Sequence, residues 1–489
     1  MDSADDGYAF RHVLVRDALA DATTPARAAL LHREAARVLC ARIVTDPLEI
    51  AHHARLGGDI DLAADALERA AAAATQRFDH GAAEDLLDQA LRWSDAPARR
   101  LARARTRTMR GRYDTALDDV AVAIASGAGA SALETGAWAA YFARRFDESR
   151  SFADDGIALA LDPALRASCL TVAGRVRHAS GDLAGAEPLL HEAVSLANGP
   201  ARAVPTVWLG VLRSHQSRPR EALELLRQIT RVESGAERTT ELLHALLFTA
   251  HAHALQSQPL EALDALHRYD SELDRRHVPR FAGRASNFRG WVLRALGQWE
   301  RADDANRQAV DELGSVEFPE TLIASSLDLA ASALLRSDAT EAAERLRRAR
   351  AMLTTQLTFG WRLDLRLRLE TARLALLVDK PTDAVETSLI VERDASLLGV
   401  ARYATVARLV NARARARLGE APDLAAIERD LYALDVAVGI DSWWVTAEVA
   451  RDFSIPIWRD LALTRAALLG RRAGAENAGL ARAVATLTE

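Results

Sequence analysis

A short signature recurs nine times along this chain of 489 residues and constrains its fold more than any other feature. Each copy has a turn residue, then an aromatic residue, leucine, alanine or proline two positions on, and a small residue three positions further. The small residues are 33 to 42 positions apart, and self-similarity at such a period is typical of repeat architectures. A looser copy lies at 78–83. The nine copies are Gly111-Tyr113-Ala116, Arg144-Phe146-Ser149, Gly181-Leu183-Ala186, Ser217-Pro219-Ala222, Ser257-Pro259-Ala262, Gly297-Trp299-Ala302, Ser337-Ala339-Ala342, Asp379-Pro381-Ala384 and Glu420-Pro422-Ala425.

Each position of the signature has a physical role in a pair of helices. Glycine and serine tolerate the backbone geometry that ends a helix. Proline suits the start of the next helix, because its missing N–H is not needed there. The small residue lets the two helices approach closely. Seven positions beyond it, about two helical turns, a second and mostly apolar position completes a buried stripe. These second positions are Ala123, Gly156, Ala193, Ile229, Tyr269, Ala309, Ala349, Val391 and Tyr432.

The pattern resembles tetratricopeptide repeats. The unit from Gly290 to Ala309 is most similar to the consensus, with Leu293 in its first helix and Gly297 and Trp299 at its turn. We therefore predict an all-α fold, a right-handed α-α superhelix of about nine or ten helical hairpins over residues 57–440, with a concave groove. The residues expected to pack these repeats are Gly111, Ala116, Gly181, Ala186, Ala222, Ala262, Gly297, Ala302, Ala342, Ala384 and Ala425.

The two ends do not follow the repeat. Residues 441–489 are expected to form closing helices, with Trp443, Trp444 and Trp458 capping the core. Residues 1–56 are expected to be a helical segment. The run from Tyr8 to Leu19, together with residues 31–39 and 49–53, resembles the junction between the ATPase module and the repeats in large LuxR-type ATP-binding regulators of actinobacteria.

That resemblance implies an order of parts: an ATPase, a winged helix, a tetratricopeptide sensor and a C-terminal DNA-binding helix-turn-helix. A phosphate-binding loop of the ATPase kind needs a lysine directly after a glycine. The only lysine here, Lys380, follows Asp379. Residues 441–489 do not match a LuxR-type helix-turn-helix either. The chain is therefore expected to correspond to the sensor portion, with the ATPase and DNA-binding modules belonging to the intact family architecture.

Composition excludes several functional classes. The formal net charge of −6 provides no strong positive field, so we expect no direct binding of nucleic acid and no membrane association. Two cysteines build neither a disulfide framework nor a four-cysteine metal site. Residues 1–7 lack the apolar core of a secretory signal, and a cytoplasmic location is expected.

Catalytic and metal-binding patterns are not apparent. The chain has no G-x-S-x-G nucleophile motif. The adjacent carboxylates Asp118-Asp119 and Asp303-Asp304 are interpreted as solvated, and the thirteen histidines as packed or surface residues without ligand spacing. We predict no catalytic residue, no cofactor and no metal.

An arginine-rich run is the most distinctive polar feature. Arg99, Arg103, Arg107 and Arg110 follow helical spacing and are candidates for a basic patch in the groove that binds an acidic peptide or a phosphate. The alternative is a solvated face on which these arginines pair with Asp and Glu residues.

The leading functional hypothesis is a non-catalytic regulatory or sensor module that binds a protein or peptide partner, or a small effector, in its groove. One alternative is a stand-alone assembly scaffold unrelated to transcription. The other is an enzyme whose site is not recognisable from the sequence.

Overall fold

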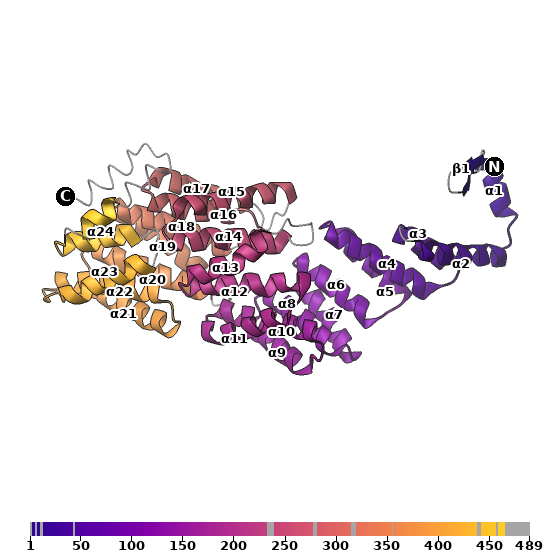
Figure 1. Ribbon diagram of the computed structural model, residues 1–489, viewed down its shortest axis with the longest axis horizontal. Helices are drawn as coiled ribbons and strands as arrows, with labels where there is room; N and C mark the ends of the chain where they lie inside the picture. The colour runs from indigo at the N-terminus through magenta and orange to yellow at the C-terminus, as the bar shows by residue number, and fades with distance from the viewer. Residues whose placement is uncertain are drawn as a thin grey trace. The chain divides into compact units, whose positions relative to one another are not determined.

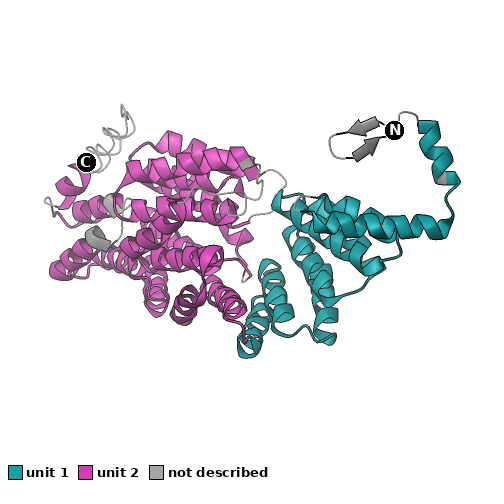
Figure 2. Ribbon diagram, turned by 45° about the vertical axis from the view of Figure 1, so that its right-hand side comes forward, with its two compact units in different colours: residues 1–160 teal, residues 161–489 magenta. Residues whose placement is uncertain are grey.

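The computed structural model describes residues 2–4, 7–9, 13–42, 45–231, 239–276, 281–313, 319–354, 356–437, 442–455 and 458–464. These residues divide into two compact units, 1–160 and 161–489, shown in different colours in Figure 2. The boundaries predicted at residues 56 and 440 rest on pattern and resemblance and stay predictions. None of the helices in the described segments is both long and apolar enough to cross a lipid bilayer.

Unit 1 contains two short strands and nine helices among its described residues (Figure 1). The strands pair antiparallel at residues 2–4 and 7–9, so the expectation of helix throughout residues 1–56 is wrong there. Helices α1 to α3 account for most of the remainder of that segment. The elements are β1 Asp2–Ala4, β2 Gly7–Ala9, α1 Val13–Asp21, α2 Pro25–Ala41, α3 Pro47–Leu56, α4 Ile60–Gln76, α5 His80–Trp93, α6 Pro97–Met109, α7 Tyr113–Ala125, α8 Gly129–Phe142 and α9 Phe146–Leu159.

Unit 2 is helical throughout its described residues. Its hairpins pair an even-numbered first helix with the odd-numbered helix that follows. The elements are α10 Pro163–Ser180, α11 Leu183–Leu196, the 3-10 turn η1 Gly199–Arg202, α12 Ala203–His215, α13 Pro219–Thr230, α14 Thr239–Leu255, α15 Pro259–Arg276, α16 Arg284–Ala295, α17 Trp299–Leu313, α18 Pro319–Leu335, α19 Ala339–Met352, α20 Gly360–Leu377, α21 Pro381–Leu397, α22 Ala401–Arg417, α23 Leu424–Ala437 and α24 Ser442–Asp452.

The predicted turn register is confirmed in both units. Eight turn residues of the signature, together with Phe78 of the looser copy, have left-handed backbone with φ between 55° and 99°, and the second helix begins two residues later in each case. Where the intervening residue is aspartate, as at Asp79, Asp182 and Asp338, its carboxylate caps the new helix. The nine are Phe78, Gly111, Arg144, Gly181, Ser217, Ser257, Gly297, Ser337 and Asp379.

The small residue five positions after each of these turns is completely buried, as the close approach of the two helices requires. At the hairpin most similar to the consensus, Gly290 lies so close to the second helix that an added Cβ would stand 2.4 Å from Nδ2 of Asn306. These buried positions are Ala83, Ala116, Ser149, Ala186, Ala222, Ala262, Ala302, Ala342 and Ala384.

The last copy of the signature is placed wrongly. Its left-handed residue is Gly419, and α23 begins five residues later instead of two. The longer connection moves the packing position along the helix, so Ala425 is exposed and Ile427 is buried in its place. Tyr432, predicted to lie on the buried stripe, is exposed for the same reason.

Unit 2 is held together by contacts between hairpins far apart in sequence. Trp361 on α20 donates a 3.1 Å hydrogen bond from its indole N–H to the carbonyl of His178 on α10. Trp444 on α24 is buried and donates to the carbonyls of Arg294 and Ala295 at the end of α16. The predicted role of Trp444 in closing the core is confirmed. Trp458 packs against the same core while partly exposed, and the side chain of Trp443 lies outside the described residues.

Candidate functional site

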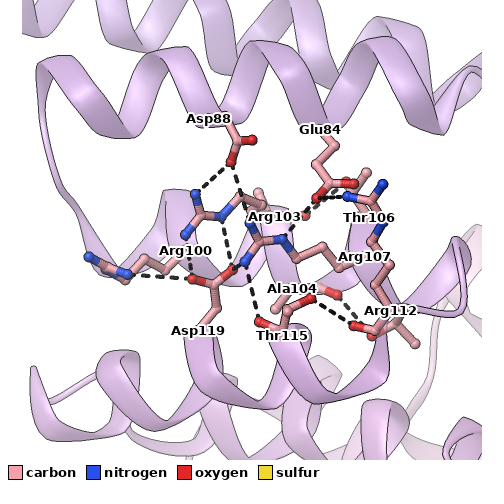
Figure 3. A network of polar contacts seen from close by, with 12 residues as sticks. Glu84, Asp88, Arg100, Arg103, Ala104, Thr106, Arg107, Arg112, Thr115 and Asp119 are labelled. Atoms are coloured by element: carbon pink, nitrogen blue, oxygen red, sulfur yellow. Dashed lines mark hydrogen bonds and ion pairs between the residues drawn. The ribbon is translucent and has the colours of Figure 1, made fainter.

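The four arginines predicted to form a basic patch belong to unit 1. Arg99, Arg103 and Arg107 are four residues apart on α6, and Arg110 follows the end of that helix. Such spacing places side chains on one face of a helix. In the structure this face lies against carboxylates contributed by α5 and α7 (Figure 3). Its first arginine, Arg99, meets a carboxylate from α4.

Asp119 on α7 is the centre of this network. Nε and Nη2 of Arg103 donate to its two oxygens over 2.9 Å and 2.6 Å, and Nη1 of Arg107 donates to it over 2.8 Å. Arg103 also donates to Asp88 on α5 over 2.6 Å. Asp119 is only 2% exposed, so the interpretation of Asp118-Asp119 as solvated is wrong for its second member. The same is true of Asp303, which is buried and pairs with Arg336.

Glu84 on α5 is the second buried carboxylate of the network. It accepts hydrogen bonds from Arg107, Arg110 and Arg112 over 2.6 Å to 3.0 Å. Burial raises the pKa of Glu84, but the hydrogen bonds from Arg107 and Arg110 outweigh burial and hold that pKa below its ordinary value. Glu84 therefore stays ionised and holds α5 to α6.

Arg99 is engaged separately, by Asp65 and Glu68 on α4 and by the carbonyl of Ser94. Arginines and carboxylates are matched in number across the whole cluster. The arginines are Arg99, Arg100, Arg103, Arg107, Arg110 and Arg112, and the carboxylates are Asp65, Glu68, Glu84, Asp88, Asp95 and Asp119. The predicted pairing with acids is therefore present, in a part-buried arrangement instead of a solvated one. Ligand binding by these arginines stays a prediction.

A different group of arginines lines two hollows in unit 2. The first has a volume of about 680 Å³ and the second about 450 Å³, each including its open mouth. Both are built mainly from first helices of the hairpins, and Arg366, Arg402 and Tyr403 line both. Together the two linings contain five arginines but only two carboxylates. The arginines are Arg294, Arg362, Arg366, Arg373 and Arg402, and the carboxylates are Asp328 and Glu370.

Asp328 on α18 organises the second hollow. Its carboxylate accepts a 2.6 Å hydrogen bond from Arg294 on α16 and a 2.8 Å hydrogen bond from Arg366 on α20. The amide of Asn287 donates to it over 3.0 Å. Burial raises the pKa of Asp328, yet the two guanidinium charges outweigh burial and keep that pKa below its ordinary value. One buried carboxylate on α18 thus fixes side chains from the preceding and the following hairpin.

Arg362, one turn before Arg366 on α20, has no such partner. Its Nε is buried without a hydrogen-bond partner, and among the described residues no carboxylate forms an ion pair with its guanidinium. Burial lowers the pKa of Arg362. Tyr403 and Asp328 oppose part of this shift, while the neighbouring charges of Arg366 and Arg402 add to it. A buried cation without a counter-charge is costly, because it has lost water without gaining a replacement.

Three aromatic rings line the same hollow as Arg362. Trp291, Phe288 and Tyr403 line the second hollow, and the guanidinium carbon of Arg402 lies 5.6 Å from the Trp291 ring centre. We call the group of Arg362, Arg366, Arg402 and these three rings the arginine pocket. It combines apolar surface with fixed N–H donors, the usual composition of a ligand-binding site.

Helix α24 packs on the adjoining surface of unit 2 through one acidic and one aromatic side chain. Glu448 on α24 lies between Arg373 on α20 and Arg413 on α22, at 2.8 Å and 2.9 Å. Its carboxyl is buried, and the two arginine charges outweigh burial to hold the pKa of Glu448 below its ordinary value. Four residues earlier, Trp444 lines the first hollow. A helix that carries a tryptophan and a glutamate one turn apart is therefore already docked here.

Three histidines stack beside the arginine pocket on consecutive first helices. His178 on α10 and His215 on α12 have ring nitrogens 2.9 Å apart, and His251 on α14 has a ring nitrogen 2.6 Å from the hydroxyl of Ser214. Burial lowers the pKa of His178 to about 3, with Arg175 and Arg362 adding to the shift. Burial followed by the charge of Arg362 also lowers the pKa of His215 and of His251. All three are neutral at pH 7.

The arginine pocket was not predicted from the sequence, although the spacing of its charged residues carries a signal. Arg294, Asp328 and Arg366 are separated by 34 and 38 positions, and Arg362 and Arg402 by 40, which are repeat distances. Side chains one repeat apart on first helices become neighbours when hairpins stack. A search for charged residues at the repeat period, instead of charges close together in sequence, finds these residues.

Comparison with known proteins agrees with this architecture. A Rap protein solved in complex with Competence and Sporulation Factor matches with a TM-score of 0.52 and 14% identity, covering 73% of this chain and 98% of its own. The fold is that of tetratricopeptide-type helical repeats. A human IFIT1 dimer solved with PPP-AAAA matches at 0.46 and 13%, covering 90% of this chain and 94% of its own. A tetratricopeptide repeat protein from Parabacteroides merdae matches at 0.38 and 14%, covering 54% and 98%. No protein-family model and no curated protein matches the chain.

Proposed function

We propose that the chain is a non-catalytic binding module, and that unit 2 takes up a segment of a protein partner on the surface formed by its first helices. The observation that carries this proposal is Arg362, a buried guanidinium that forms no ion pair among the described residues and lines a hollow together with aromatic rings. Burying an unpaired cation does not stabilise the folded chain. It does prepare a site in which a bound anionic group can pair with the guanidinium. The solved complex of the similar Rap protein with a bound factor supports a binding role.

We further propose that binding regulates a signalling ATPase and a DNA-binding module of the LuxR type. This part rests on the resemblance of the segments within residues 8–53 to the junction found in such regulators. Genomic context tests this part of the proposal. A neighbouring reading frame that encodes the ATPase would support the link to transcription, whereas a neighbouring frame that encodes part of an unrelated complex would favour the stand-alone scaffold.

An enzyme is the least favoured alternative. The hollows are lined by arginines and aromatic rings, and the histidines beside them have lowered pKa values and lie in the core. A catalytic acid or base needs a pKa near the working pH.

A site-specific photocrosslinker tests the binding role. It replaces Tyr403, which lines both hollows, in the full-length chain in a native lysate. The matched control carries the same group at Tyr432, which is 64% exposed on α23. The proposal expects one protein to crosslink at position 403 and not at 432. Equal crosslinking at both positions, or none at 403, overturns it.

A further inference from the structure

The arginine pocket also constrains the chemistry of what binds there, provided that the proposed function holds. We propose that the pocket recognises an acidic side chain on a helical segment of the partner, and that an aromatic side chain one helical turn away packs beside it.

The charge requirement follows from Arg362 and its surroundings. Asp328 is engaged by Arg294, Arg366 and the amide of Asn287, and it forms no ion pair with Arg362. Glu370 is engaged by Arg373. Among the described residues no carboxylate lining the pocket remains for Arg362. The missing group must be an acceptor with negative charge, and a carboxylate matches the planar fork of a guanidinium.

The shape requirement follows from the rings around that charge. The second hollow is about 450 Å³ and is open on one side, with Phe288, Trp291 and Tyr403 in its lining. An open hollow of this kind can receive a side chain of a partner but not a folded domain. The apolar rings favour an aromatic or aliphatic neighbour next to the acidic group.

The internal example identifies a helix as the carrier. α24 forms part of the wall of the adjoining first hollow through Trp444, which donates a hydrogen bond to the end of α16. One turn later, Glu448 lies between two arginines. The two hollows share Arg366, Arg402 and Tyr403, so the surface that holds α24 continues into the arginine pocket. A partner helix with the same pair of side chains would extend this docking to the arginine that lacks a carboxylate.

Synthetic peptides test this chemistry directly. The probe is a fluorescein-labelled, amidated helical peptide with tryptophan and glutamate four positions apart on an alanine background, titrated with the full chain and followed by anisotropy. Two variant peptides replace glutamate by glutamine or tryptophan by alanine. A third keeps both residues but ends in a free carboxylate. The proposal expects the glutamine peptide to bind about 10- to 100-fold more weakly, as for loss of a hydrogen bond to a charged group.

Protein variants then locate the binding. R362Q is expected to weaken binding of the glutamate peptide by about the same factor, with no further effect on the glutamine peptide. R393Q, which removes an equal charge from the exposed side of α21, is the matched control and is expected to change nothing. R362K, which restores the charge but not the planar fork, is expected to bind with intermediate affinity.

Each result is decisive. Glutamate-dependent binding that R362Q leaves intact overturns the proposal, as does peptide binding that depends only on the free terminal carboxylate, or no binding at millimolar concentration. A partner that crosslinks at position 403 with equal yield in wild type and R362Q would refute this inference while leaving the proposed function standing.

Discussion

The two units bury polar groups in opposite ways. In unit 1, six arginines meet six carboxylates, and the most buried acids, Glu84 and Asp119, each accept from several guanidinium groups. In unit 2, three neutral histidines lie beside Arg362. Among the described residues, no carboxylate forms an ion pair with the guanidinium of Arg362. The arginines that are close together in sequence are therefore the ones that are paired with carboxylates. The unsatisfied charge comes from arginines scattered one repeat apart.

The difference shows that arginine density alone is a poor indicator of an anion site. What matters is where the carboxylates fall when the hairpins stack. In unit 1 they come from the helices on either side of α6, so pairing is complete. In unit 2, Asp328 pairs with two arginines and not with Arg362.

The largest expected difference between the units appears on mild acidification. The pKa of His178 is about 3 in the folded chain, below its ordinary value of 6.5, so only the unfolded chain takes up a proton as pH falls below 6.5. Each such histidine costs about 1.4 kcal/mol of stability per pH unit in that window. In unit 1 the lowered pKa of Glu84 gives stability that is lost only below its ordinary pKa of 4.5.

Between pH 6.5 and 4.5 we therefore expect unit 2 to lose more stability than unit 1, in which burial and the neighbouring His32 and His52 lower the pKa of His53. Hydrogen exchange read by mass spectrometry, corrected for intrinsic rates, gives the stability of both units in the intact chain. H178Q is expected to reduce the pH slope of unit 2 by about one proton. Parallel loss in both units would contradict the comparison.

The next largest effect is expected from breaking the unit 1 network at its centre. Asp119→Ala leaves Arg103 and Arg107 part-buried with fewer acceptors, and should lower the stability of α6 and α7 by about 3 kcal/mol. Asp118→Ala removes the same charge from an exposed neighbour and should cost less than about 0.5 kcal/mol. Urea unfolding of the two variants measures the difference. Equal destabilisation would mean that the network contributes nothing beyond general charge.

The repeat register, the helix starts and the buried small residues are predictable from the sequence because they are local. A left-handed turn residue, a helix start two positions on and a small residue at the fifth position depend on neighbouring residues and on one partner helix. The prediction failed at Ala425 because three extra residues after Gly419 shift the helix start, and nothing in the spacing of single residues reveals that.

The site was much less predictable. Whether Arg103 is neutralised depends on Asp88 and Asp119, which lie 15 and 16 positions away and point inward only when the hairpins have formed. Whether Arg362 is left without a partner depends on Asp328, which pairs instead with Arg294 on α16 and with Arg366 on α20. Partner choice among many arginines and acids is decided by three-dimensional stacking, and the sequence alone leaves it open.

Replacing one arginine in each unit gives a smaller but sharper contrast, since the signs are opposite. Arg103→Met removes two hydrogen bonds from Asp119 and one from Asp88, and should lower stability by about 2 kcal/mol. Arg362→Met removes a buried charge that has no counter-charge and should raise stability by about 1 kcal/mol. Thermal unfolding measures both. Destabilisation by Arg362→Met would show that Arg362 is compensated in the free protein and would remove the basis for an anion site there.

The smallest expected effect concerns the turns that both units share. Ser337 in unit 2 has φ of 59° and an exposed side chain, and a non-glycine residue pays about 1–2 kcal/mol for this left-handed conformation. Ser337→Gly relieves that strain but makes the unfolded chain more flexible, so a net gain in stability of about 0.5 kcal/mol is expected.

Gly297→Ser, at φ of 75° in the preceding hairpin, should lower stability by a similar amount. Arg144→Gly in unit 1 should gain less than Ser337→Gly, because Arg144 takes part in side-chain interactions that glycine gives up. Urea midpoints of the three variants rank these effects, and a gain from Gly297→Ser would show that the left-handed turn is not what selects glycine or serine at these positions.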